Sequence, residues 1–134
     1  MPYLKINYDN TTKPTFEALD LPEDSWAWLD ACYNAINCTT LATAPTVFEH
    51  IVLVIDDEGK LWDGWEDRIN KIASILYGTT WDSIVGDAIL ARVDGENLVP
   101  LTSVDIYCLE RYFRFNPTAT KRLDEILEQL SNTP

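Results

Sequence analysis

The segment of residues 47–55 constrains the fold of this chain more than any other feature. It is rich in β-branched side chains, its last five residues are continuously apolar, and the turn sequence Asp56-Asp57-Glu58-Gly59 follows at once. Such a run predicts a central strand of a sheet. From Trp62 the apolar spacing changes to three and four residues, which predicts a helix over 62–78 with Asp63 as its cap and Gly78 as its stop.

Shorter patterns supply the remaining elements. Alternating or β-branched segments predict strands near residues 4–8, 39–43, 84–93 and 98–99, with Asp94-Gly95 as a turn. Pro45 is expected to interrupt the chain before the central strand. A capping box at Thr102 and Asp105 opens a helix that reaches Phe113, and a last helix is expected at about 117–131. We expect one α+β domain over 1–134, with a mixed or antiparallel sheet of 4–5 strands and 3–4 helices.

A helix predicted between Pro22 and Asn37 carries apolar residues on two sides. The main stripe is expected to be Trp26, Leu29, Tyr33 and Ile36, and the second patch Trp28, Ala31 and Ala35. Such a helix is either deeply buried or docked on something else.

The charge balance limits the kinds of partner that the protein can bind. The chain has 22 acidic and 10 basic residues, a net charge of −12, and 13 of the acids against 4 bases lie in residues 1–70. A surface this acidic repels nucleic acid and anionic membranes and attracts basic partners. Direct nucleic-acid binding and membrane binding are therefore not expected.

The cysteines indicate the compartment. Cys32, Cys38 and Cys108 are an odd number without a CxxC motif, which suits a reducing environment. The first 20 residues lack an apolar targeting segment. We expect a cytoplasmic protein.

Several short motifs occur together in an order that resembles a known family. They are a helix before Thr39, the stretch 51–60, the tetrad Asn70-Lys71-Ile72-Ala73, the stretch 84–88, and Pro100-Leu101-Thr102 opening a helix. Over residues 24–113 the chain resembles the small phage, prophage and plasmid proteins known as domain of unknown function 3846. The resemblance implies a mobile-element origin, with a bacterial host's cytoplasm as the location, and supplies no catalytic residue. The chain departs from the family at Trp62-Asp63-Gly64-Trp65 and in its C-terminal helix.

Catalysis and metal binding have little support in the residues. His50 is the only histidine, and no cysteine lies in a basic cluster that would activate it as a nucleophile. A Cys₃His zinc site lacks the close ligand pairs that structural zinc needs, and no calcium or phosphate-binding loop is present. We predict no catalytic residue, no metal and no cofactor.

The preferred hypothesis is a surface that imitates nucleic acid, with carboxylates in place of phosphates and aromatic anchors beside them. The acids are Asp56, Asp57, Glu58, Asp63, Glu66 and Asp67, and the anchors are Trp28, Trp62, Trp65 and Trp81. The protein would then inhibit a basic, nucleic-acid-handling host or defence factor. The alternative is that Trp62 and Trp65 belong to the core and that the acids are only solvated.

A second hypothesis places a ligand near the C-terminal arginines. Arg92, Arg111 and Arg114, with Tyr107, Tyr112 and Phe113, would hold a nucleotide-derived signal, so that the protein acts as a sponge. The same arginines would otherwise only cover apolar surface. Homo-oligomerisation stays open.

Overall fold

The computed structural model describes residues 2–8, 16–78 and 82–112. The elements follow the order β1 (Tyr3–Ile6), β2 (Phe16–Leu19), α1 (Ser25–Ile36), β3 (Leu41–Pro45), β4 (Ile51–Asp56), the 3-10 turns η1 (Gly59–Leu61) and η2 (Trp65–Arg68), α2 (Lys71–Tyr77), β5 (Ala88–Asp94), β6 (Asn97–Val99) and α3 (Ser103–Tyr112). The sheet has the order β2-β1-β5-β4-β3, and β6 pairs with β5. Every strand pair is antiparallel. The α+β prediction is therefore confirmed, and the sheet is antiparallel rather than mixed.

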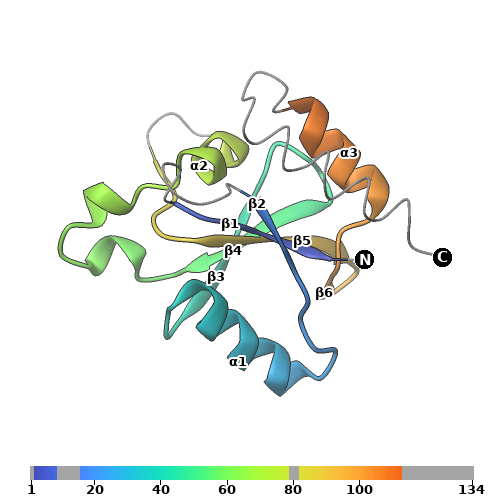
Figure 1. Cartoon of the computed structure of the whole chain (residues 1–134), viewed down its shortest axis with the longest axis horizontal. Coiled ribbons are helices and arrows are strands. Elements are labelled where there is room, and N and C mark those ends of the chain that lie inside the picture. Colours follow the sequence, from blue (N-terminus) through green and yellow to red (C-terminus); the bar gives the residue numbers. More distant parts are fainter. Residues whose placement is uncertain (1, 9–15, 79–81, 113–134) are drawn as a thin grey trace.

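Helices cover both faces of this sheet, with α1 on one face and α2 and α3 on the other (Figure 1). Side chains of β5 alternate between two cores, since Ala88 and Leu90 pack on the side of α2 and α3 whereas Ile89 and Ala91 pack on the side of α1. In β4, Leu53 and Val54 divide in the same way. This double burial explains the continuous apolar run from which a central strand was predicted, and β4 does lie between β5 and β3.

The strand predicted over 47–55 is shorter than expected, because a turn occupies its first half. Thr46 Oγ1 accepts a hydrogen bond from the Phe48 N–H at 3.1 Å and lies 2.7 Å from the Ile51 carbonyl. Pro45 ends β3 instead of interrupting it, which its position on an edge strand permits. Likewise β5 begins at Ala88 rather than at residue 84, after Gly86 adopts a φ of +82°. The sequence analysis missed β2.

Helix α1 confirms the predicted helix but corrects its buried face. The Asp24 carboxylate caps it by accepting from the Ala27 N–H at 3.0 Å, and its buried residues are Cys32 and Ile36. Trp26 is 80% exposed, because it lies about 120° around the helix axis from Cys32. The buried face of α1, marked by Cys32 and Ile36, thus lies between the two apolar patches that were predicted.

The single helix predicted over 62–78 is wrong. Two 3-10 turns precede a short helix α2, whose N-cap is Asn70 rather than Asp63. Gly64, with a φ of +76°, separates the two turns, and Gly78 ends α2 as predicted. The capping box is confirmed, since Thr102 Oγ1 accepts from the Asp105 N–H at 3.1 Å and Asp105 Oδ2 accepts from the Thr102 N–H at 2.9 Å. The last helix, expected at 117–131, lies outside the described residues.

Candidate functional site

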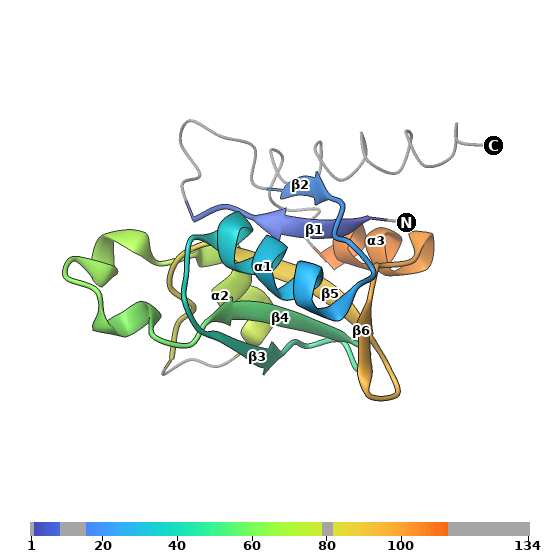
Figure 2. The same ribbon diagram turned by 90° about the horizontal axis from the view of Figure 1, so that it is seen from below.

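Residues 56–68, which we call the acidic loop, join β4 to the residues before α2. The loop contains the end of β4, η1 and η2, and it projects from one end of the sheet (Figures 1 and 2). Six carboxylates and two cations give it a net charge of −4. Carboxylates that lie within the Debye length of about 8 Å at physiological salt act together on a charged partner.

The first half of the acidic loop is shaped by Asp56. Its carboxylate accepts hydrogen bonds from the Glu58 N–H at 2.9 Å and from the Trp62 indole N–H at 3.2 Å. Gly59 is buried, and a Cβ atom there would lie 3.2 Å from the carbonyl oxygen of Val85. The hydrogen bonds of Asp56 therefore stabilise the shape of the loop. The close packing of Gly59 against Val85 holds the loop near the segment before β5.

The second half is held by the two basic side chains. The guanidinium of Arg68 lies 5.3 Å from the ring centroids of both Tyr8 and Trp62. The ammonium of Lys60 lies 5.9 Å from the ring of Trp65 and forms an ion pair with Asp82. Hydrogen bonds from Lys60 and from the backbone of Ser83 lower the pKa of Asp82. Both cations thus contact aromatic rings of the loop, and Lys60 also pairs with a carboxylate outside it.

The outer side chains of the acidic loop face solvent. Leu61 is 79% exposed and Trp62 is 46% exposed, whereas Trp65 is partly buried. The exposed acids are Asp57, Glu58, Asp63, Glu66 and Asp67. The structure therefore brings together all six predicted acids and two of the predicted tryptophans. The alternative that Trp62 belongs to the core is wrong, because the predicted helix that would have buried it does not form.

The other aromatic candidates do not join this site. Trp28 lies on α1 and lines a pocket elsewhere, and Trp81 lies outside the described residues. The sequence analysis missed Leu61 and Trp26, which are the two most exposed large apolar residues of the described chain. For Leu61 a signal existed, since Leu61-Trp62 is an apolar pair between Lys60 and Asp63.

The residues of the second hypothesis are only partly gathered. Tyr107 and Arg111 lie together on α3, with the guanidinium 5.8 Å from the ring centroid. Arg92 instead binds Asp105 at 2.7 Å, so its charge is neutralised by a carboxylate that is nearly buried. Arg114 and Phe113 lie outside the described residues.

Two of the three cysteines, Cys32 and Cys38, are buried in the core on the side of α1. Burial raises the pKa of both Cys32 and Cys38 to about 11, which keeps the thiols neutral. His50 is exposed just before β4, and its Nε2 lies 4.0 Å from the carboxylate of Glu49. Within the described ranges, no three histidine, cysteine or acidic side chains gather where a metal ion would bind. No helix in this part of the chain is both long and apolar enough to cross a membrane.

Comparison with known proteins gives one match. A family model described as a domain of unknown function (DUF3846) matches residues 6–114, which confirms and lengthens the resemblance seen in the sequence. The match includes the whole acidic loop. No curated protein and no solved structure matches the chain.

Proposed function

Because this chain belongs to the family of domain of unknown function 3846, whose description assigns no activity, we propose a function from its surface. We propose that the protein is a non-enzymatic binding protein that presents the acidic loop to a basic partner. The partner is a nucleic-acid-handling or defence factor of a bacterial host. Binding at fixed stoichiometry blocks the groove in which that factor holds phosphates, as an anti-restriction or anti-CRISPR protein would.

The observation that carries this proposal is the exposure of five carboxylates around Leu61 and Trp62. Carboxylates steer a basic surface into contact, and a central apolar or aromatic side chain then supplies most of the contact energy. Acidic residues that serve only solubility need no exposed apolar centre. The combination therefore favours an interface over a merely solvated surface.

The supports of the acidic loop favour the same function. Hydrogen bonds to Asp56 and the placement of Arg68 between two rings hold the loop in one shape before a partner arrives. A preformed loop loses less conformational entropy on binding than a flexible one. The carboxylate of Asp56 is already used within the loop, so we assign contact with the partner to the outer acids.

The test is a charge reversal of the outer acids. The triple variant Asp57→Lys, Asp63→Lys, Glu66→Lys changes the net charge from −12 to −6 without touching the supports of the loop. Wild-type protein is used to capture partners from host lysate, the bound protein is identified by native mass spectrometry, and its affinity for both forms is then measured in pure solution. We expect at least about a hundredfold loss, since several charge pairs of about 1 kcal/mol each disappear.

A matched control variant separates the effect of the charges in the acidic loop from the effect of the net charge of the protein. The triple variant Asp20→Lys, Glu49→Lys, Asp94→Lys also has a net charge of −6, and its three positions are exposed and lie outside the loop. It should retain most of the affinity, and the captured partner should lose its nucleic acid when the wild-type protein binds. Equal losses in the two variants, or a partner that still holds nucleic acid in the complex, would contradict the proposal.

A further inference from the structure

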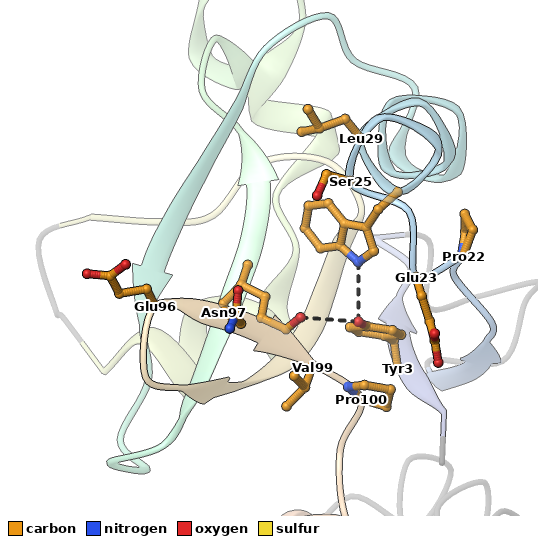
Figure 3. Close-up of a pocket in the computed structure, with 11 residues that line it drawn as sticks. Tyr3, Pro22, Glu23, Ser25, Leu29, Glu96, Asn97, Val99 and Pro100 are labelled. Carbon is orange, nitrogen blue, oxygen red and sulfur yellow. Dashed lines mark hydrogen bonds between the residues drawn. The ribbon is translucent and has the colours of Figure 1, made fainter.

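A concave site lies between the first turn of α1 and the β5–β6 hairpin, elements at the end of the molecule opposite the acidic loop (Figure 2). It is a pocket of about 490 Å³ between the first turn of α1, the start of β1 and the hairpin of β5 and β6. Cavities of this size hold small organic molecules. Its wall includes Tyr3, Trp28, Leu29, Val99 and Pro100 (Figure 3).

The polar atoms of the two aromatic side chains are paired, whereas Ser25 and Asn97 add further polar groups to the lining of the pocket. The indole N–H of Trp28 donates to the Tyr3 hydroxyl at 3.2 Å, and that hydroxyl donates to the carbonyl of Leu98 at 3.4 Å (Figure 3). The two rings are tilted by 60° with centroids 6.4 Å apart. Burial raises the pKa of Tyr3, so its hydroxyl keeps the proton that it donates to the Leu98 carbonyl. The part of the wall formed by Tyr3, Trp28 and Leu29 therefore offers aromatic and aliphatic surface to a ligand.

Among the described residues, the charged ones that line the pocket are both acidic. They are Glu23 and Glu96, and no lysine or arginine of this part of the chain lines it. Both glutamates are exposed, and neither takes part in the ion pairs of the described residues, which use other acids. In the view of Figure 3, Glu23 lies on the same side of the pocket as Tyr3 and Pro100, whereas Glu96 extends outward from the hairpin. Anions such as nucleotides are repelled from this site, and cations are attracted.

We propose that this pocket binds a small organic cation in which an ammonium or guanidinium group is joined to an apolar ring. The ring packs on Trp28 and Tyr3, and the cation faces the carboxylate of Glu23. Glu96 adds attraction at longer range. The site is independent of the acidic loop, so this inference does not rest on the function proposed above.

The test uses three probes that share a phenyl ring and differ in charge: 2-phenylethylammonium, 2-phenylethanol and 3-phenylpropionate. The indole N–H resonance of Trp28 reports binding in NMR titrations of the whole chain, and it is assigned as the resonance missing from Trp28→Phe. We expect a saturable shift with the ammonium, about fivefold weaker binding of the alcohol and none of the carboxylate. Equal affinities for the three probes, or no saturable shift at millimolar concentration, would overturn the proposal.

Glutamate variants test the role of charge. Glu23→Gln should weaken binding of the ammonium about fivefold and leave binding of the alcohol unchanged, because it removes only a charge. Glu49→Gln is the control, since its side chain is exposed outside the pocket. Ammonium binding that is equally strong in Glu23→Gln and Glu49→Gln would overturn the assignment of Glu23, and with it the cation site.

Discussion

The side-chain amide of Asn70 donates a hydrogen bond to the backbone carbonyl of Ile6 at 2.9 Å, across 64 positions of the chain. The same amide donates to the carbonyl of Gly86 at 3.0 Å, and its oxygen caps α2 by accepting from the Ala73 N–H at 3.1 Å. Asn70 is fully buried. One side chain thus joins β1, the segment before β5 and the helix that follows the acidic loop.

Asn70→Ala should therefore destabilise the protein strongly. It leaves two buried carbonyls and one helical N–H without their partner, and the expected loss is about 2–4 kcal/mol in the free energy of unfolding. Urea denaturation followed by tryptophan fluorescence measures it. Asn70→Asp keeps the cap of α2 but places a carboxylate against the carbonyls of Ile6 and Gly86, so this variant should also be less stable than the wild type. A loss below about 0.5 kcal/mol in Asn70→Ala would show that water replaces the amide.

Gly86 should tolerate a side chain poorly for two reasons. Its φ is +82°, and a Cβ atom would lie 3.3 Å from a guanidinium nitrogen of Arg68. The left-handed backbone alone costs a residue with a Cβ about 1–2 kcal/mol. Gly95→Ala is the matched control, because Gly95 has a φ of +64° and open space around it. We expect Gly86→Ala to be the less stable variant in thermal unfolding, and equal losses would mean that Arg68 moves freely.

The ion pair between Arg92 and Asp105 should stabilise the start of α3. Arg92→Met leaves a carboxylate that is only 8% exposed without its cation, and we expect a loss of about 1–3 kcal/mol. Arg111→Met is the control, since Arg111 is exposed on the same helix and should change stability by less than about 0.5 kcal/mol. Urea denaturation compares the two. Equal effects would contradict the assigned role of Arg92.

The buried thiols predict a loss of stability in alkali. Folding raises the pKa of Cys32 and Cys38 from 9.0 to about 11, so the folded state holds these protons more tightly than the unfolded state does. The contribution of the two thiols to the free energy of unfolding should be fully present below pH 9, and it should be lost as the pH rises towards 11. Tyr3, whose pKa is raised above 10.0, adds a change of the same sign at higher pH. Cys32→Ala should show a smaller fall in urea denaturation at the same pH values, and a flat wild-type profile would contradict the prediction.

Alkylation gives an independent check on the same thiols. Iodoacetamide at pH 8 should modify Cys108, which is only partly buried, before Cys32 and Cys38. All three cysteines should react in urea. Peptide mass spectrometry identifies the modified positions, and early modification of Cys32 in the native protein would show that α1 opens readily.

The sequence by itself determined the features that depend on neighbouring residues. The apolar runs that become β4 and β5, the capping box of Thr102 and Asp105, and the stop at Gly78 are local patterns, because strand burial and helix caps involve residues a few positions apart. The acidic loop was likewise visible as a dense group of carboxylates. Their closeness in the chain was readable from the sequence, whereas the two 3-10 turns that fold the segment back on itself were not.

Only the tertiary structure decided which aromatic side chains face solvent. Trp62 and Trp65 have helical spacing, yet Gly64 and the long-range hydrogen bonds of Asn70 break that helix into turns. Trp26 lost its predicted place in the core because α1 docks on the sheet through Cys32 and Ile36. The pocket beside Trp28 combines residues from α1, β1 and β6. Helix rotation and contacts between distant segments depend on packing against the whole sheet, and periodicity within one segment does not contain that information.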